Sequence, residues 1–243
     1  IWTAIFSKDL AHYRLSTFRR MHDTPVLITG ESGTGKDLVA RAVAYSQYVP
    51  FDPESRTFAA DPYASYLPTN ITAFNPNTVE SALFGHRRGA FTGADSDHQG
   101  WFEACGPYGS IFLDEIGDLD PSIQVKLLRV VQQREVHRMG ESIVRRFAGK
   151  VVSATHHDLD RDVEEGRFRA DLYYRLRGVH IVTPTLRAQL DDRPDDLANL
   201  ALIAARNVLD PDEAEGAAAE AVAWIDAHLG PHYPWPNNMR ELE

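Results

Sequence analysis

Short apolar runs recur through most of the chain, and a polar turn and a segment with helical spacing follow them. The runs lie at residues 25–29, 110–113, 151–155 and 179–182. Four or five consecutive apolar or small residues are typical of a strand buried on both faces of a parallel sheet. Apolar residues recur at helical spacing over residues 38–44, 76–84, 120–136 and 166–176. This alternation predicts an α/β fold, with a parallel sheet flanked by helices.

The composition changes near residue 190. From there onward acidic residues and alanine dominate, and apolar residues recur at helical spacing over 197–204 and 217–229. We therefore predict two subdomains. The first is an α/β subdomain over residues 1–189, and the second is a small all-helical subdomain over residues 190–243.

The remaining segments have weaker patterns. Residues 1–23 carry apolar and basic residues at a spacing that predicts a helix. Residues 48–66 are rich in proline, aspartate and serine, which predicts an irregular segment, and residues 137–149 predict a surface hairpin or loop. Residues 239–242 have the pattern of a helix start. The first residue is not Met, so we expect the chain to be a piece of a longer protein.

A glycine-rich turn separates the first apolar run from the first helix. Its glycines can adopt positive φ, which lets successive backbone N–H groups point at an anion, while the following helix adds the positive end of its dipole. Lys36 supplies a charge for the β- and γ-phosphates. The usual pattern places Ser or Thr after the lysine, and here that position is Asp37. The alternative interpretation is a glycine-rich turn that has no role in nucleotide binding. The predicted nucleotide site comprises Gly30, Glu31, Ser32, Gly33, Thr34, Gly35, Lys36, Asp37 and Leu38.

Two acids end the second apolar run. Asp114 and Glu115 follow residues 110–113, at the carboxyl end of a predicted strand, where parallel sheets bind ligands. Asp114 would hold magnesium, and Glu115 would polarise the attacking water. A polar turn that caps the next helix is the alternative, but the phosphate loop upstream favours the catalytic interpretation.

Residues 85–94 combine three glycines with a single aromatic side chain. Such a segment is a poor core element, because glycine loses backbone entropy and offers no side chain to bury. We predict a flexible loop with Phe91 exposed at its tip, where the ring could dock on a partner.

The overall composition narrows the class of protein. The formal net charge is −10, which argues against a surface that binds nucleic acid throughout, although a local basic patch stays possible. Cys105 is the only cysteine, so an internal disulfide and a cysteine-rich metal site are excluded. No apolar run approaches the roughly 20 residues that span a bilayer. We expect a cytosolic, cytoplasmic protein. His156 and His157 would point apart on a strand, so we expect no structural metal site.

Residues 166–176 predict a helix whose apolar stripe is Phe168, Leu172 and Leu176. Arg169 and Arg175 lie off this stripe. From the pattern alone, both arginines are interpreted as solvated surface residues.

Together these motifs resemble the central AAA+ ATPase domain of bacterial enhancer-binding proteins, the activators of sigma-54 RNA polymerase. The most specific match is Gly-Ala-Phe-Thr-Gly-Ala at 89–94, the hallmark loop of that family, preceded by Leu-Phe-Gly-His at 83–86. An acid after the lysine, here Asp37, also resembles this family. The resemblance covers nearly the whole chain, with further matches at 112–117, 168–176 and 235–242.

The resemblance implies a P-loop AAA+ domain followed by a small helical lid that begins near residue 190. It implies a ring of subunits, typically a hexamer, which binds ATP and Mg²⁺ at each interface and hydrolyses ATP. The work would be mechanical, because the nucleotide state would raise or lower a loop that opens the sigma-54 polymerase complex. Phe91 and Thr92 would touch sigma-54 at the tip of that loop. The implied contact residues are Gly89, Ala90, Phe91, Thr92, Gly93 and Ala94.

Roles for further residues follow from the same resemblance. Arg169 and Arg175 would be arginine fingers that reach a neighbouring subunit's site, which reverses the interpretation from the pattern. Arg240 would contact a phosphate of the nucleotide bound to its own subunit. Asn70 would hold Glu115 away from water until the ring is engaged. His156 stands where the family usually has an asparagine that senses the γ-phosphate.

The chain departs from the family pattern at several positions. His156 can hydrogen bond at the sensor position but carries a pH-dependent charge, which puts the coupling of hydrolysis to movement in doubt. Ala82 replaces a glutamate, Asn237 replaces a glycine, and the stretch before Asn70 is longer than usual. The phosphate loop, Asp114 and Glu115 are intact.

Two other functions stay open from the sequence. One is a nucleotide-binding assembly module that has lost turnover, and the other is an AAA+ motor for a different protein client. The family places its DNA-binding domain after the final motif, so contact with DNA would come only through a domain outside this chain.

Overall fold

The computed structural model describes residues 23–47, 49–61, 66–73, 75–230 and 232–242. The chain divides into two compact units. The first, called here the α/β unit, comprises Ile1–Thr29 and Asp37–Ile181. The second, called the helical unit, comprises Gly30–Lys36 and Val182–Glu243. The helix predicted over residues 1–23 lies outside the described residues, apart from Asp23.

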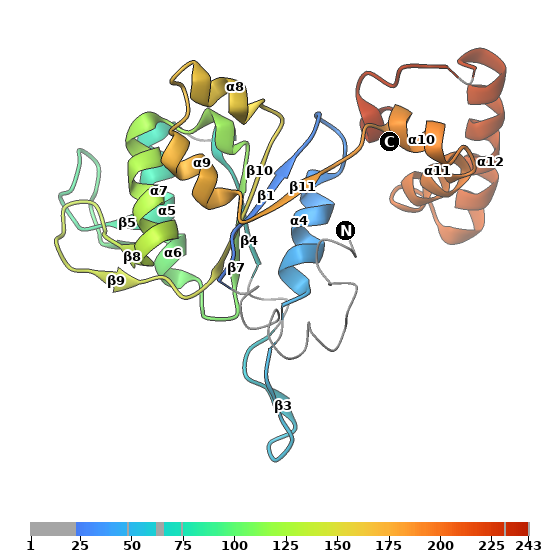
Figure 1. The fold of residues 1–243 in the computed structure, drawn as a ribbon. Helices are drawn as coiled ribbons and strands as arrows, with labels where there is room; N and C mark the ends of the chain where they lie inside the picture. The colour runs from blue at the N-terminus through green and yellow to red at the C-terminus, as the bar shows by residue number, and fades with distance from the viewer. Residues whose placement is uncertain (1–22, 48, 62–65, 74, 231, 243) are drawn as a thin grey trace. The chain divides into compact units, whose positions relative to one another are not determined.

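A parallel sheet forms the centre of the α/β unit (Figure 1). Among the described residues it has the strand order β11-β1-β10-β7-β4. The pairs β1 with β10, β10 with β7 and β7 with β4 are parallel. The strands are β1 (Val26–Thr29), β4 (Tyr66–Asn70), β7 (Ser110–Asp114), β10 (Lys150–Thr155) and β11 (Val179–Val182).

The edge strand β4 is the one that the sequence pattern did not locate. It carries Pro68 at its centre, and its exposure alternates irregularly. Proline cannot donate a ladder hydrogen bond, so it is confined to edges such as this one. The position of β4 places Asn70 opposite Asp114 in the register with β7.

Both faces of the sheet are buried, as the apolar runs predict. Alternate residues of β7 face opposite sides: Ile111 and Leu113 pack into one core cluster, and Phe112 packs into another. Figure 1 shows α5, α7 and α9 on one side of the sheet and α4 on the other. These helices are α4 (Lys36–Tyr45), α5 (Pro76–Phe84), α7 (Pro121–Gln133) and α9 (Ala170–Leu176), with short helices α6 (Trp101–Ala104) and α8 (Leu159–Glu164) beside them.

The helix starts follow from local capping. Asp120 accepts a hydrogen bond from the backbone N–H of Ser122 at the start of α7, and Pro121 is its first residue. The predicted continuation of this helix to Val136 is wrong. The helix ends at Gln133 because Arg134 adopts a left-handed conformation with φ of 60°, and Val136 belongs to a strand instead.

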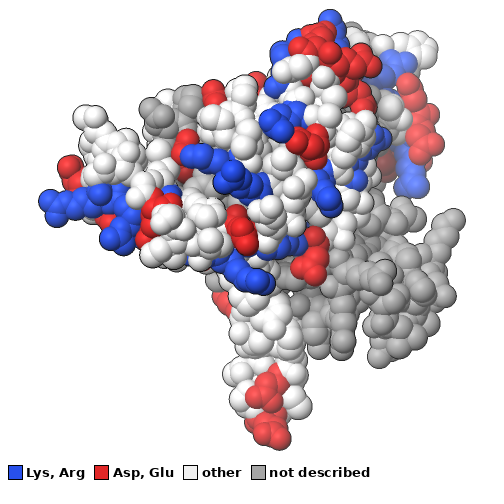
Figure 2. Space-filling view, turned by 60° about the vertical axis from the view of Figure 1, so that its left-hand side comes forward, with Lys and Arg blue, Asp and Glu red and all other residues white. Residues whose placement is uncertain are grey.

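In the part of the α/β unit that the structure describes, three two-stranded hairpins lie outside the central sheet. The first, β2 (Phe51–Asp52) with β3 (Thr57–Phe58), lies in the segment predicted to be irregular. Figure 2 shows acidic side chains at its tip, where Asp52 and Glu54 lie. The others are β5 (Gly85–His86) with β6 (His98–Gln99), and β8 (Glu135–Val136) with β9 (Arg145–Arg146).

The helical unit packs around a small core of its own. Leu186, Ile225 and Trp235 form its buried cluster. Its helices are α10 (Leu186–Asp192), α11 (Asp196–Arg206), α12 (Pro211–His228) and the 3₁₀ helix η4 (Asn238–Glu241). α12 starts earlier than the predicted 217 because Pro211 is well suited to the first helical position. No helix in the described part of the chain is both long and apolar enough to cross a membrane.

Cys105 and Lys150 are two of the buried titratable groups in the α/β unit. Burial raises the pKa of the Cys105 thiol to about 12, so this thiol is protonated and unreactive at neutral pH. Burial also lowers the pKa of Lys150 to about 8, and its Nζ donates a hydrogen bond to the carbonyl of Thr24 at 3.0 Å.

A fully buried glutamine fixes the start of α9. Gln124 of α7 donates from Nε2 to the carbonyls of Leu119 and Arg167, at 2.8 and 3.1 Å. Its Oε1 accepts a hydrogen bond from the backbone N–H of Arg169, the N-cap of α9, at 2.9 Å. The side chain therefore ties three backbone groups of two different loops to one helix.

We predict that Gln124→Leu lowers the free energy of unfolding by about 2 to 4 kcal/mol, because it leaves these buried backbone groups unsatisfied. Urea unfolding followed by circular dichroism measures the change. Gln132→Leu, at an exposed position of the same helix, is the matched control. Equal midpoints for the two variants would show that the contacts of Gln124 contribute little.

Candidate functional site

The glycine-rich loop joins β1 to α4. Gly30, Gly33 and Gly35 have φ of 156°, 78° and 77°. A Cβ at Gly30 would collide with Oγ1 of Thr183, and a Cβ at Gly33 would collide with the carbonyl of Asn237. The backbone conformation and the close neighbours thus both require glycine in this loop.

The side chain of Lys36 turns into this loop. It is 7% exposed, and its Nζ donates hydrogen bonds to the carbonyls of Gly30 and Glu31, at 2.9 and 3.0 Å. Oγ1 of Thr34 donates to the same carbonyl of Glu31 at 2.8 Å. The ammonium group is therefore held inside the loop, beside the N-terminus of α4. Asp37 and Leu38 follow in the first turn of α4, and both are exposed.

The C-terminal motif packs on the glycine-rich loop. Asn238 is fully buried, and its Oδ1 accepts a hydrogen bond from the backbone N–H of Leu186 at 2.8 Å. Its Nδ2 donates to the carbonyl of Ser32 at 2.9 Å and to Oε2 of Glu31 at 3.2 Å. Arg240 Nη1 donates to Oγ of Ser32 at 3.0 Å. One amide thus connects the loop to the first helix of the helical unit.

The acidic pair lies at the carboxyl end of β7. Asp114 is the last residue of that strand, and its Oδ1 accepts a hydrogen bond from the N–H of Glu115 at 3.1 Å. Glu115 adopts a left-handed backbone conformation, with φ of 56° and ψ of 48°. Glutamate rarely adopts this conformation, and such backbone strain is found preferentially at functional sites.

Glu115 contacts the next strand through a histidine. Its Oε2 lies 2.7 Å from Nδ1 of His156 and accepts a weaker bond from the backbone N–H of the same residue at 3.3 Å. The expectation that His156 and His157 point apart is wrong, because both follow β10 in a turn and their ring centroids are 4.6 Å apart. Oδ1 of Asn70 accepts hydrogen bonds from the N–H and hydroxyl of Thr72.

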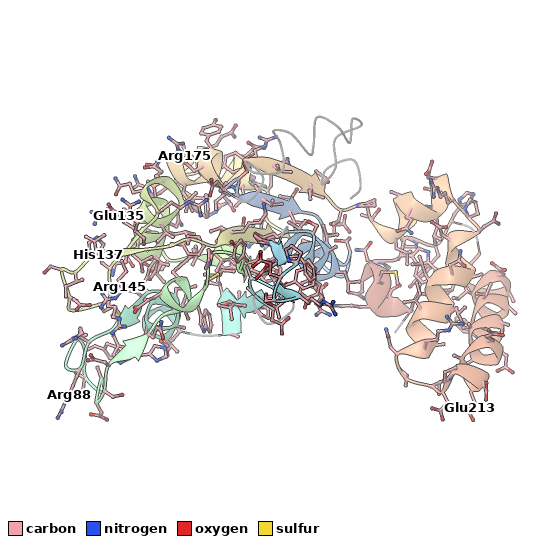
Figure 3. All side chains as sticks on the ribbon, turned by 90° about the horizontal axis from the view of Figure 1, so that it is seen from below. Arg88, Glu135, His137, Arg145, Arg175 and Glu213 are labelled. Carbon is pink, nitrogen blue, oxygen red and sulfur yellow. The ribbon has the colours of Figure 1, made fainter. Side chains whose placement is uncertain are left out.

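The two candidate arginine fingers differ in their surroundings. Arg169 forms a bidentate pair with Asp171, with distances of 3.0 and 2.7 Å, which raises the pKa of Arg169 and lowers that of Asp171. Arg175 is exposed on α9, where Figure 3 shows it on the outside of the unit. No residue in the described part of the chain forms a salt bridge with Arg175.

Residues 85–94 form one arm of a hairpin and are not a core segment. The 89–94 turn closes on itself, since the N–H of Gly89 donates to the carbonyl of Ala94 at 2.9 Å and the N–H of Ala94 donates to that of Phe91 at 3.0 Å. Thr92 and Gly93 are exposed. Phe91 differs from the prediction, because it is half-buried with its ring edge 4.9 Å from the ring of His86.

The base of this hairpin is anchored on the neighbouring β8–β9 hairpin. The backbones of Gly85 and Arg87 exchange hydrogen bonds with Met139, at 2.9 and 3.0 Å. Arg138 pairs with both oxygens of Glu103 at 2.7 Å, which lowers the pKa of that carboxyl. Figure 3 shows Arg88 at the outer end of the β5–β6 hairpin, away from this anchored base.

Some residues that shape the site were missed by the sequence analysis. The motif at 235–242 was recognised, but nothing in the pattern distinguishes the buried Asn238 from the exposed Asn237. The hydrogen bond between His156 and Glu115 joins two segments that are far apart in the sequence. The sequence signal for this contact is that a polar residue follows each of two predicted strands, Glu115 after residues 110–114 and His156 after residues 151–155.

Comparisons with known proteins agree with this geometry. The family model for the sigma-54 interaction domain matches residues 8–182. The hydrogenase transcriptional regulatory protein HoxA of Cupriavidus necator is 44% identical over 221 residues, covering 91% of this chain and 42% of HoxA. The transcriptional regulatory protein ZraR of Escherichia coli is 42% identical over 222 residues, covering 91% of this chain and 46% of ZraR. The chain thus spans less than half the length of these relatives.

Solved structures show the same fold. A crystal structure of NtrX from Brucella abortus has a TM-score of 0.68 and 27% identity, covering 99% of this chain and 50% of NtrX. A second structure of NtrX, in complex with ATP, has a TM-score of 0.67 and covers 97% of this chain and 48% of NtrX. A reconstruction of Hsp104, at 14% identity and a TM-score of 0.58, shares the fold alone.

The parallel sheet, the phosphate loop and the acidic pair define the P-loop AAA+ class, which confirms the predicted fold class. Within that class, the chain belongs to the sigma-54 interaction domain family, because the family model covers most of its length. The resemblance inferred from the 89–94 motif is therefore confirmed.

We predict that Asn238→Gly weakens nucleotide binding about three- to thirtyfold, because loss of the buried amide side chain frees the glycine-rich loop from α10. Glycine keeps the positive φ of 54° at this position, so backbone strain does not confound the result. Titration with a fluorescent ATP analogue measures the change. Asn237→Gly, at the exposed neighbouring position, is the control. Equal affinity in both variants would contradict a role for Asn238 in holding the loop.

Proposed function

We propose that this chain is the ATP-hydrolysing motor domain of a sigma-54-dependent transcriptional activator. The observation that carries the proposal is the glycine-rich loop with Lys36 turned into it, in a chain whose β7 ends at Asp114 and is followed by Glu115. The family membership and the structure of NtrX with ATP support it. Action on RNA polymerase would place the protein in the cytoplasm.

The residues at the loop fit a nucleoside triphosphate. Three glycines with positive φ leave the backbone free of side chains, and the N-terminus of α4 adds its dipole. Lys36 would exchange its two carbonyl contacts for phosphate oxygens. Arg240 would contact a phosphate of the nucleotide that is bound to its own chain. The other loop residues, Glu31, Ser32 and Thr34, shape the cradle through their backbone groups.

The acids at the end of β7 fit the remaining roles. Asp114 offers carboxylate oxygens, which Mg²⁺ prefers, and the metal ion would shield the charge of the phosphates when bound. Glu115 would orient and polarise the attacking water. Asp37 and Leu38 lie at the start of α4, where they would border the nucleotide.

The site would be completed by an arginine from a neighbouring subunit in a ring, typically a hexamer. An arginine supplied in trans neutralises charge on the transferring phosphoryl group and makes hydrolysis depend on assembly. Arg175 is the better candidate, because Arg169 is already paired with Asp171. Arg169 would serve in trans only after leaving that pair.

The 89–94 turn would be the element that touches sigma-54. It lies at the end of a hairpin whose base is anchored at Met139, while Gly89 and Gly93 flank the tip with positive φ of 82° and 95°. A hairpin with a fixed base and glycines beside its tip is suited to change position with the nucleotide state. Phe91 and Thr92 would make the contact, and Ala90 and Ala94 would shape the turn.

Glu115→Gln is expected to lower kcat for ATP about a hundredfold or more, because the amide cannot take up a proton from water. Affinity for ATP should stay close to that of the unchanged chain. Phosphate release at high protein concentration measures turnover. Glu164→Gln, an exposed glutamate on α8, is the control. Equal turnover in the Glu115 and Glu164 variants would instead favour a nucleotide-binding assembly module.

Phe91→Ala is expected to weaken capture of sigma-54 at least about tenfold in the presence of ADP and aluminium fluoride, because a central aromatic contact is lost. ATP turnover should be retained, since Phe91 lies outside the nucleotide-binding residues. Phe58→Ala, which removes an exposed phenylalanine from another hairpin, is the matched control. Unchanged capture by Phe91→Ala would indicate a different protein client.

A further inference from the structure

His156 holds Glu115 through one carboxylate oxygen. Oε2 of Glu115 lies 2.7 Å from the ring Nδ1 and 3.3 Å from the backbone N of this histidine. A carboxylate oxygen only accepts hydrogen bonds, so Nδ1 must carry the proton of the shorter bond. An ionised carboxylate has about four acceptor sites, and His156 takes two of them.

The position of His156 is itself fixed by its neighbours. The residue follows directly on β10, and its ring packs edge to face on the ring of His157. His157 lies between Asp118, at 3.3 Å from Nε2, and Asp162, at 3.0 Å from Nδ1. A Cβ at Gly117 would collide with the ring of His157, so the turn after Glu115 accommodates this packing. The imidazole of His156 is thus part of a built cluster.

Asn70 does not make the contact with Glu115 that the family resemblance implies. Its Oδ1 is occupied by the N–H and hydroxyl of Thr72, at 2.9 and 2.7 Å. Among the described residues, the side chain of Glu115 is hydrogen bonded to His156. The restraint on the proposed base therefore comes from β10, on one side of β7, and not from β4, on the other.

We propose that His156 is the positioning residue that holds Glu115 in a waiting state and so restrains basal ATP hydrolysis. The inference rests on the proposed function, because it assigns the control of the same site. While Oε2 is bound to His156, the carboxylate cannot rotate freely to present its lone pairs to a water molecule. Release of the Nδ1 contact frees the carboxylate for general-base work.

The test compares His156→Ala and His156→Asn in the full chain, without sigma-54. Loss of the hydrogen bond in His156→Ala should raise basal kcat about three- to tenfold, the effect expected of one partly exposed hydrogen bond, while KM for ATP changes little. The amide Nδ2 of asparagine lies close to the position of Nδ1 and can donate the same bond, so His156→Asn should reverse most of the increase. His228→Ala, at an exposed histidine of the helical unit, is the control.

The outcomes separate this inference from the proposed function. If the unchanged chain shows no turnover that depends on Glu115, the proposed function fails and the inference fails with it. If the unchanged chain turns over ATP but His156→Ala leaves kcat unchanged or lowers it, the inference alone is overturned. Thermal melting and binding of a fluorescent ATP analogue establish that each variant is folded. If His156→Ala does not fold, His156→Leu, which also lacks the donor, takes its place. A kcat above that of the unchanged chain then supports the inference, and an unchanged or lower kcat overturns it.

Discussion

Burial of the central sheet on both faces is the constraint on which the rest of the α/β unit depends. Because helices cover both faces, polar chemistry is possible only where the strands end. Asp114 and Glu115 follow β7, His156 follows β10, and Asn70 ends β4 beside Asp114. The parallel ladders place these ends at one edge of the sheet, so the strand pairing that builds the core also assembles the polar groups.

Two buried amide side chains each fix a loop, one in the α/β unit and one in the helical unit. Gln124 satisfies three backbone groups around the start of α9, which carries both candidate arginines. Asn238 does the same between the glycine-rich loop and α10. In each case one side chain fixes a loop through backbone groups that would otherwise be buried without partners.

The sequence predicted the elements whose signals are local. Apolar runs located β1, β7, β10 and β11, and the helical spacing of apolar residues located α5 and α7. It did not locate β4, because an edge strand with Pro68 lacks the apolar pattern. It also placed Val136 in a helix, because the left-handed Arg134 leaves no signal in composition. Contacts such as His156 with Glu115 depend on strand order, which a single sequence does not reveal.

We propose that an arginine of one subunit completes the nucleotide site of the next. Mixing Glu115→Gln with Arg175→Ala tests it most directly, because each variant lacks one half of the site and supplies the other. The account predicts that the mixture hydrolyses ATP faster than the sum of the two variants measured separately. A mixture no more active than that sum would contradict completion of the site by Arg175 of a neighbour.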